Sequence, residues 1–573
     1  MAGIVTGGAE IKYERLSVIP LGGQSELGQV LWVISYGGEL LLVDAGAAYP
    51  GDDLPGVDLL LPNTNFLESN QERITALLLT NGHEEHSGAV TYLLNHLKIP
   101  RIMGPRFVST LISQNLTNRG FDTAIDTIET RHPYQIGPFG VEWIQVNDAI
   151  ADACALKIDT PEGRIIYTSS FKLDQTPVDN RLLDVARLAQ TGDQGVLLLI
   201  SDSAGVENHG YTPSERAVVA GLDKHIALAR GRVIVVIPGT NTHRLQILFD
   251  LARKLNRKVV LVGETLIQTA VVAAITGNLV YDRKIEASLD GLSALPDQEV
   301  LVVATGIEGD PMNLVQELAY AQHGELSVKA GDTVIYSAEI LPGSSRLMAN
   351  ILDAFLSAGV KAVNGPRDGV HVSKHASREE LRLMLSLARP RYFVPALGEG
   401  RHIMHHAQLA IDWGLPADAV FPLKNGEILE IGNGIASLIG SLESQAVLYN
   451  RDQGERVTTF SVNERKSLSL EGVVTIGCAL DARGNLVSGP VIEAGASGFL
   501  QSAEWVSARQ ELIEAISECI SISKQSGKED VSALRASVRE LAAKFLRSRL
   551  QAKPMIQVVI HELVTSHPQE PER

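Results

Sequence analysis

The sequence predicts an α/β protein of several domains, and three observations support this fold class. The chain has 573 residues, too many for a single hydrophobic core, so two to four domains are expected. Short apolar runs separated by turns fill its first part, which is typical of stacked mixed sheets. From Val196 onward, apolar runs alternate with helical patterns, which indicates βαβ units around a parallel sheet.

The first part of the chain is expected to hold closely spaced strands. Residues 15–20 lead into a Leu-Gly-Gly turn, and further strands are expected at 30–35 and 38–46. The apolar run 74–79 is typical of a buried strand. It is followed at once by residues 80–88, which are rich in histidine and acidic side chains.

The middle part is predicted to form the parallel sheet. Its apolar runs are short, and helical stretches separate them. The expected helices include residues 216–229 and 243–255. The expected strands are 196–200, 233–237, 259–262, 300–304 and 333–336.

The last part returns to short strands and ends in a small α+β unit. Strands are expected at 421–423 and 427–431, and the polar segment 450–456 is the best linker candidate. A frayed tail is expected at 566–573, where two prolines lie among polar residues. Between linker and tail we expect a strand at 473–480, helices at 502–523 and 530–548, and a final strand at 555–561.

The bulk composition is that of an ordinary globular protein, and it narrows the function classes. Hydrophobic residues make up 45% of the chain and charged residues 20%. The net charge of −17 argues against attraction to nucleic acid over the whole surface, although it leaves room for a local basic channel. Cys154, Cys478 and Cys519 are widely spaced, so we expect core residues rather than a disulfide framework.

No targeting or membrane segment is apparent in the sequence. Residues 1–7 show no charged region followed by a long apolar block, so we expect no signal peptide. No apolar stretch reaches the roughly 20 residues that a bilayer crossing needs. We therefore expect a cytoplasmic protein with no membrane partner.

The stretch 80–88 is similar to a metal-binding loop in which one ligand is missing. It reads Thr-Asn-Gly-His-Glu-Glu-His-Ser-Gly. Imidazole nitrogen and carboxylate oxygen are the ligands on which zinc-type sites draw. Asn81 stands where a histidine would complete the pattern His-x-His-x-Asp-His, and Glu85 stands where that pattern has aspartate.

A series of short motifs follows along the chain, from about residue 16 to residue 563. They are Leu21-Gly22-Gly23, Val43-Asp44-Ala45-Gly46, Gly56-Val57-Asp58, Phe171-Lys172-Leu173-Asp174, Ser201-Asp202-Ser203, His243-Arg244-Leu245-Gln246, Gly309-Asp310-Pro311-Met312 and residues 371–377. Taken in order, these motifs resemble the ribonuclease J family of metallo-β-lactamase/β-CASP ribonucleases. The resemblance implies an α/β fold with a metallo-β-lactamase αββα core, an inserted β-CASP domain and a small α+β C-terminal domain.

The resemblance also implies a division of the chain and an assembly. We expect the metallo-β-lactamase core at 1–210 and 368–448, with the β-CASP domain inserted at 211–367. We expect a linker at 449–464, the C-terminal domain at 465–563 and a flexible tail at 564–573. Members of the family act on RNA as 5′-to-3′ exonucleases or endonucleases, and commonly assemble as dimers and tetramers.

The family implies a two-metal site with seven ligands, and this chain keeps few of them. His83 and His86 are retained, while Glu85 and Asp148 are chemically acceptable substitutes for two other ligands. The remaining three positions carry an amide, a hydroxyl and an alkyl side chain, namely Asn81, Ser170 and Leu397.

Ser170 is the most damaging of these replacements. A neutral hydroxyl does not offset the charge between two cations as a bridging carboxylate does. We expect zinc or manganese, if any metal binds, as one ion or none. Two interpretations stay open. Either His83, His86, Glu85 or Asp148 hold a single ion, or the histidines are inherited fold elements that hydrogen-bond to backbone or RNA.

The side of the site that faces RNA is better preserved. Residues 371–375, His-Val-Ser-Lys-His, match the family's substrate-binding loop except that Lys374 replaces a glycine. The match implies that His375 is the catalytic acid for the leaving oxygen. The structural alternative for His375 is a core histidine. For His243 and Arg244 it is a helix cap and a surface charge. The residues expected to contact RNA are His371, Val372, Ser373, Lys374, His375, His243 and Arg244.

The sequence therefore predicts a ribonuclease J homologue that acts on RNA in its maturation and decay, with weak or lost hydrolysis. An alternative is a catalytically inactive RNA-binding or assembly subunit that partners an active ribonuclease. A third hypothesis is a purely structural assembly protein. We also expect a homo-oligomer, either a dimer or a tetramer.

Overall fold

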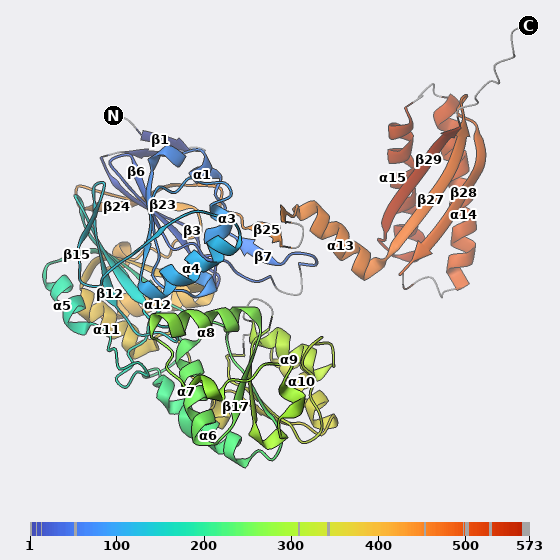
Figure 1. The fold of residues 1–573 in the computed structure, drawn as a ribbon. Coiled ribbons are helices and arrows are strands. Elements are labelled where there is room, and N and C mark those ends of the chain that lie inside the picture. The colour runs from blue at the N-terminus through green and yellow to red at the C-terminus, as the bar shows by residue number, and fades with distance from the viewer. Residues whose placement is uncertain are drawn as a thin grey trace, which may run out of the picture. The chain divides into compact units, whose positions relative to one another are not determined.

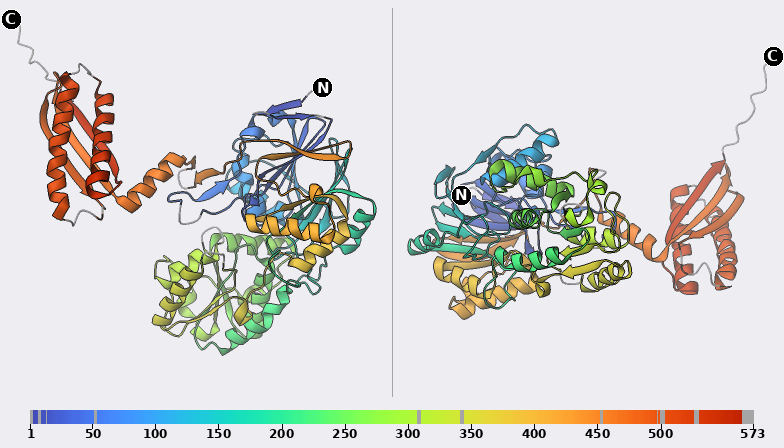
Figure 2. Two further views of the ribbon diagram at one scale, coloured as in Figure 1. Left: turned by 180° about the vertical axis from the view of Figure 1, so that it is seen from behind. Right: turned by 60° about the horizontal axis from the view of Figure 1, so that its bottom comes forward.

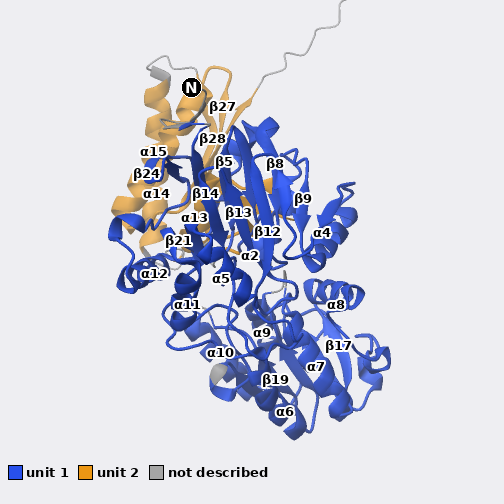
Figure 3. Ribbon diagram, turned by 90° about the vertical axis from the view of Figure 1, so that its left-hand side faces the viewer, with its two compact units in different colours: residues 1–48, 60–447 blue, residues 49–59, 448–573 orange. Residues whose placement is uncertain are grey.

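The computed structural model describes residues 3–6, 9–12, 14–50, 54–306, 310–340, 344–451, 454–496, 498, 503–525 and 530–563 (Figure 1). The chain divides into two compact units, which Figure 3 colours separately. The first comprises residues 1–48 and 60–447, and the second comprises residues 49–59 and 448–573. Among the described helices, none combines the length and the apolar character that a bilayer crossing requires.

The first unit contains two mixed sheets. β6 pairs in parallel with β8 but antiparallel with β5, as expected for a mixed sheet. The larger sheet has the order β10 (Ile125–Thr127), β9 (Ile102–Gly104), β8 (Ile74–Leu78), β6 (Glu39–Val43), β5 (Leu31–Tyr36), β3 (Leu16–Gly22), β23 (Glu427–Gly432) and β24 (Ile435–Ser441). The smaller sheet has the order β11 (Tyr134–Ile136), β12 (Phe139–Gln145), β13 (Cys154–Thr160), β14 (Gly163–Tyr167), β15 (Val196–Asp202) and β21 (Pro390–Ala396).

A shared hydrophobic core lies between these two sheets. Trp32 and Leu78 of the larger sheet and Trp143 and Leu198 of the smaller sheet belong to one buried cluster. Helices pack against the sheets from outside, as Figures 1 and 2 show for the gold helices α11 and α12. This αββα arrangement confirms the predicted core. The covering helices are α4 (Arg106–Asn118) on the larger sheet, and α5 (Val185–Asp193), α11 (Arg378–Ala388) and α12 (Gly400–Trp413) on the smaller one.

A five-stranded sheet is inserted in the chain between β15 and β21. All its neighbouring strands are parallel, which confirms the predicted βαβ region. Its order is β17 (Lys258–Val262), β18 (Val300–Ala304), β16 (Val233–Val236), β19 (Thr333–Tyr336) and β20 (Lys361–Asn364). Helices flank it on both faces (Figure 1), namely α6 (Val218–Leu228), α7 (Thr242–Lys254), α8 (Glu264–Thr276), α9 (Pro311–Ala319) and α10 (Ser345–Ser357).

β15 belongs to the core sheet, although its sequence marks the start of the alternating region. It pairs in parallel with β14 on one side and β21 on the other. All of its residues are buried. A strand covered on both faces has the same continuous apolar pattern in either parallel environment, so the pattern alone does not select its partner.

The second unit contains a three-stranded sheet covered on one face by two long helices. Alternate residues of β27, such as Val474 and Ile476, are buried in the cluster that these helices complete. The predicted strands and helices of this unit are confirmed. Its elements are β27 (Val473–Asp481), antiparallel to β28 (Leu486–Gly495) and parallel to β29 (Met555–Leu563), with α14 (Ala503–Gln525) and α15 (Val531–Leu550).

β28 and α13 are the longest elements of the second unit that are missing from the sequence prediction. β28 contains Gly489 and Pro490, which argue against a strand. The helix α13 (Thr459–Glu471) buries only Val462, so it lacks an apolar face, and it occupies part of the predicted linker 449–464. Its capping signal was present, because the N-cap Thr458 accepts the backbone N–H of Ser461 at 3.1 Å. The predicted tail 564–573 lies outside the described residues.

Candidate functional site

The candidate site lies where polar segments follow the carboxyl ends of parallel strands. β6 and β8 lead into Asp44 and residues 79–83, while β14, β15 and β21 lead into residues 168–172, Asp202 and Leu397. The carboxyl ends of parallel strands meet at one edge of a sheet, which is a common place for ligand sites. Residues that are far apart in sequence therefore come together here.

His83 precedes the short helix α2 (Glu84–Ser87) and is buried with both ring nitrogens engaged. Its Nδ1 lies 2.7 Å from Thr240 Oγ1, and its Nε2 lies 2.8 Å from Asp148 Oδ1. Burial, followed by the charge of Lys374, lowers the pKa of His83 to about 4. The imidazole is therefore neutral at pH 7, and we assign the tautomer that donates Nε2–H to the carboxylate.

His86 is fully buried beside Asp44, which is fully buried as well. His86 Nδ1 lies 2.7 Å from Asp44 Oδ2, and Nε2 lies 3.3 Å from Ser170 Oγ. Asp44 also accepts hydrogen bonds from the hydroxyls of Thr80 and Tyr167, each at 2.9 Å. The orientation of His86 is thus fixed by a carboxylate that is itself held by two hydroxyl donors.

Asp148 lies at the centre of the same network. Its Oδ1 contacts His83 and the backbone N–H of Ala149, and its Oδ2 accepts a hydrogen bond from Ser170 Oγ at 2.6 Å. Burial alone would raise the pKa of Asp148, but the contacts with His83 and Ser170 lower it to about 2. The side chain is therefore a carboxylate, and protein donors engage both of its oxygens.

The three positions at which the sequence predicts a missing ligand are part of the folded framework. Asn81 Oδ1 accepts the backbone N–H of His83 at 2.9 Å, and Asn81 Nδ2 donates to Ser169 Oγ at 3.0 Å. Ser170 donates to Asp148. Leu397 is buried in the core between the two sheets. The polar atoms of Asn81 and Ser170 are thus engaged within the network, and Leu397 offers no donor or acceptor in its side chain.

Glu85 and Lys374 form an ion pair across the site. Glu85 belongs to α2 and Lys374 to the loop 371–375, and their side chains are 23% and 24% exposed. Burial lowers the pKa of Lys374 to about 7. The adjacent carboxylate of Glu85 acts in the opposite direction and favours the ammonium form. Because the lysine also keeps contact with solvent, we take it as charged in this pair.

His375 is held by its neighbours, with the Nδ1 edge of its ring toward Asp202. Its Nδ1 lies 2.7 Å from Asp202 Oδ2, and Thr212 Oγ1 donates to its carbonyl oxygen at 2.7 Å. The backbone N–H of His375 donates to Ser373 Oγ at 3.2 Å. A carboxylate that orients one ring nitrogen leaves the other able to accept or release a proton. This geometry suits an acid role, which for His375 stays a prediction.

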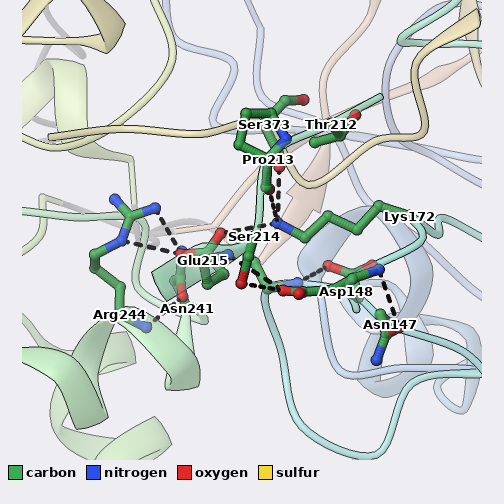
Figure 4. A network of polar contacts seen from close by, with 12 residues as sticks. Asn147, Asp148, Lys172, Thr212, Pro213, Ser214, Glu215, Asn241, Arg244 and Ser373 are labelled. Atoms are coloured by element: carbon green, nitrogen blue, oxygen red, sulfur yellow. Dashed lines mark hydrogen bonds and ion pairs between the residues drawn. The ribbon is translucent and has the colours of Figure 1, made fainter. Parts of the chain in front are cut away.

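Figure 4 shows a buried ion cluster formed by Lys172, Glu215 and Arg244. Arg244 Nη2 donates to Glu215 Oε2 at 2.7 Å, and Lys172 Nζ lies 3.4 Å from Glu215 Oε1. Lys172 also donates to the carbonyl oxygen of Ser373 at 3.1 Å, so the cluster anchors the loop 371–375. Burial alone would raise the pKa of Glu215, but Arg244 and Lys172 lower it to about 2.

Glu215 is the member of this cluster that the sequence analysis missed. No motif marks Glu215. It begins a short 3-10 helix after Pro213 and Ser214, and such a sequence is common in loops without a functional role. Arg244 is fully buried, with its donors directed to Glu215 and to carbonyl oxygens including that of Val370. That arrangement gives Arg244 a structural role, and its contact with RNA stays a prediction.

His243, His371 and Val372 complete the residues that the sequence associates with RNA. His243 is 8% exposed and lines a cavity of about 640 Å³ together with Arg181 and Arg216. Burial lowers the pKa of His243, and it lowers the pKa of His371 to about 3. Val372 packs against the hydrophobic core. Contacts of these three side chains with RNA stay predictions.

Four protein-family models match the chain. The ribonuclease J β-CASP domain matches residues 230–355, and the ribonuclease J C-terminal domain matches residues 460–563. The metallo-β-lactamase superfamily matches residues 26–112, and the zinc-dependent metallo-hydrolase RNA specificity domain matches residues 365–419. These matches follow the predicted order of domains, while the predicted boundaries stay predictions.

Several bacterial ribonucleases are similar to the chain over most of its length. It is 32% identical to ribonuclease J of Synechocystis sp., over 96% of this chain and 87% of that protein. It is 32% identical to ribonuclease J of Thermus thermophilus, over 96% of each. Ribonuclease J2 of Bacillus subtilis is 29% identical, over 96% of this chain and 99% of its own. A solved structure of a protein of unknown function from Enterococcus faecalis shares the fold, with 16% identity and a TM-score of 0.51 over 73% of this chain and 100% of that one.

The matched families imply a metal cofactor, which the residues of this site do not fit. Within the described part of the chain, no group of three or more His, Cys, Asp or Glu side chains is placed to hold a metal ion. His83 and Asp148 bond to each other, His86 Nε2 faces a hydroxyl, and Glu85 pairs with an ammonium group. A cation entering the site would have to replace each of these contacts. The donor atoms are therefore engaged by the protein itself.

Proposed function

The chain belongs to the ribonuclease J family, and on this basis we propose that it binds RNA at the candidate site while hydrolysing it weakly or not at all. RNA is the ligand named for the matched specificity domain and the substrate of the ribonucleases that the chain resembles. The proposed setting is the maturation and decay of RNA in the cytoplasm.

The closure of the polar network around Asp148 is the observation that carries this proposal. Two-metal hydrolysis of a phosphodiester needs a metal-activated water and cationic charge over the leaving oxygen. Ser170, at the place of the bridging carboxylate, instead donates a hydrogen bond to Asp148 at 2.6 Å. Leu397, at the place of another ligand, is buried in the core. A water molecule in this site would lack the metal charge that lowers the pKa of a bound water, so hydrolysis is expected to be slow.

The loop 371–375 supports the binding part of the proposal. Lys172 fixes its backbone at Ser373, and the Asp202 carboxylate orients His375. A hydroxyl, backbone N–H groups and an ammonium group in one loop are donors that suit a phosphate. His375 is placed to bind a phosphate oxygen and to hold or release a proton at Nε2.

The proposal is tested with 5′-monophosphorylated RNA in the presence of Mn²⁺. We expect the native chain to retain the RNA with little or no cleavage, and to carry well under the two ions per chain of a two-metal centre by elemental analysis. A His83→Ala/His86→Ala variant is the matched control, and any residual cleavage should be equal in both proteins. Near-stoichiometric metal, together with cleavage that the variant loses, would contradict the proposal.

We also propose that the chain forms a homo-oligomer, a dimer or a tetramer, through the C-terminal unit. The sheet of this unit is covered by α14 and α15 on one face, and Val491 on the opposite face is 53% exposed. Light scattering of the native chain should give the mass of a dimer or tetramer. Val491→Glu should reduce that mass, whereas Val506→Glu on the exposed side of α14 should not. A native monomer would contradict the assembly. The presence of an active ribonuclease partner stays a prediction.

A further inference from the structure

We propose that Lys374 is the resident cation of this site, supplying through its ammonium group the positive charge that metal ions supply in related hydrolases, and presenting it to a phosphate of RNA. This inference rests on the proposed function, because it concerns how RNA is held. It concerns a residue that stands where the family's substrate loop has a glycine.

The position of Lys374 is fixed from two sides. Its backbone lies between Ser373, whose carbonyl oxygen accepts from Lys172 at 3.1 Å, and His375, whose carbonyl oxygen accepts from Thr212 at 2.7 Å. Its ammonium group pairs with Glu85 on α2, at the loop where the sequence has the remnants of the metal-binding pattern. The ion pair therefore spans the site from the substrate loop to the former metal loop.

The ammonium group remains accessible to a ligand. The side chains of Lys374 and Glu85 are 24% and 23% exposed, whereas Lys172 and Arg244 are fully buried and paired with Glu215. An ammonium group has three N–H donors, and the single carboxylate of Glu85 leaves others free for a phosphate oxygen. Lys374 is thus the lysine of this site that combines charge with access to solvent.

The acidic side chains around the site make a cation favourable for binding a phosphate there. Asp44, Asp148, Asp202 and Glu85 all lie within the network, and a phosphate placed beside them is repelled unless positive charge offsets theirs. The ion pair with Lys374 neutralises one of these four carboxylates, that of Glu85. A site built in this way requires no dissolved ion for binding RNA, so chelators should leave the affinity unchanged.

RNA binding by single-residue variants tests the inference. The affinity of the full-length chain for a 5′-monophosphorylated single-stranded RNA is measured by fluorescence anisotropy in EDTA and again in Mn²⁺, over a range of salt concentrations. We expect the native affinity to be equal in both conditions. Lys374→Met should weaken binding by about tenfold and reduce the slope of log affinity against log salt by about 0.7, the value for one phosphate contact on a single strand.

Glu85→Gln separates the two roles that the ion pair could have. If Lys374 acts on the phosphate, removal of the competing carboxylate should tighten binding by about twofold to threefold, because the ammonium charge is no longer offset. If the ion pair only holds the loop in place, Glu85→Gln and Lys374→Met should weaken binding alike, and the inference fails. Lys329→Met, which removes the lysine of an exposed ion pair with Asp297, is the control for the loss of any surface charge.

The other possible results of these binding measurements also support or overturn the inference. Absence of RNA binding by the native chain at low salt would overturn the proposed function and this inference together. Native binding that Lys374→Met leaves intact, or that EDTA abolishes, would overturn the inference alone. Circular dichroism and the urea unfolding midpoint of each variant establish that it is folded, and Lys374→Arg, which keeps the charge, should retain most of the affinity if the fold is intact.

Discussion

His83 Nε2 lies 2.8 Å from Asp148 Oδ1, so two residues that the sequence predicts as metal ligands form a hydrogen bond with each other. Neither residue is exposed to solvent, and Thr240 and Ser170 complete the contacts of the pair. A site arranged for metal would direct these atoms toward a common point in space. Here the same atoms have become part of the internal hydrogen-bond network, and the predictions below follow from that change.

The first prediction concerns the stability that this pair provides. His83→Ala should lower the free energy of unfolding by about 2–3 kcal/mol, because it removes one hydrogen-bond donor from the buried Asp148 carboxylate. Asp148→Asn, which keeps the shape and the hydrogen bond, should cost less. Urea unfolding at pH 7 measures both. A loss below about 1 kcal/mol for His83→Ala would show that the pair is not a stabilising contact.

The second prediction concerns stability at mildly acidic pH. His406 is fully buried against Phe393, and burial lowers its pKa to about 3. Between that value and about 6.5 the unfolded chain binds a proton that the folded chain does not, so stability is lost as pH falls. From pH 6.5 to 5 this histidine alone should cost about 2 kcal/mol.

His406→Phe removes the titrating group and provides the control for this effect. The urea midpoint of the variant should depend less on pH between 6.5 and 5 than that of the native chain. Some dependence should remain, because burial also lowers the pKa of His371 to about 3. Identical pH profiles for the variant and the native chain would rule out His406 as a source of acid sensitivity.

The third prediction concerns the buried ion cluster of Figure 4. Arg244→Met should lower the free energy of unfolding by about 3 kcal/mol, because Glu215 then keeps only Lys172 as a charged partner. The double variant Glu215→Gln/Arg244→Met should cost less than the sum of its two single variants. Hydrogen exchange should report faster exchange in residues 371–375 for Arg244→Met. Lost RNA binding with unchanged stability and exchange would instead favour direct contact between Arg244 and RNA.

The fourth prediction concerns restoration of the lost ligands. Leu397→His alone should reduce stability by about 1–3 kcal/mol and take up no metal, because it places a polar ring in the core while Asn81 and Ser170 still lack ligand character. The triple variant Asn81→His/Ser170→Asp/Leu397→His supplies three of the family's ligands at once. Elemental analysis and unfolding with added Zn²⁺ or Mn²⁺ compare the two, and stoichiometric metal in the single variant would contradict the prediction.

Much of the fold was predictable because local pattern and global structure agree. The strands 233–237, 259–262, 300–304 and 333–336 form the parallel sheet as expected, since apolar runs of that length between helices have few other arrangements. α13 and β28 were missed because one lacks an apolar face and the other carries Gly489 and Pro490. The local sequence pattern of each element therefore did not predict it.

The sequence by itself determined which side chains stand at the expected ligand positions, because an amide, a hydroxyl and an alkyl group at Asn81, Ser170 and Leu397 differ in kind from histidine and aspartate ligands. Only the tertiary structure decided what the surviving groups do instead. It paired Glu85 with Lys374 and buried Arg244 against Glu215, across separations in sequence that no local motif encodes. The physical reason is that the role of a charged side chain depends on its partner and on its exposure to solvent. Both depend on which segments the fold brings together at the ends of the strands.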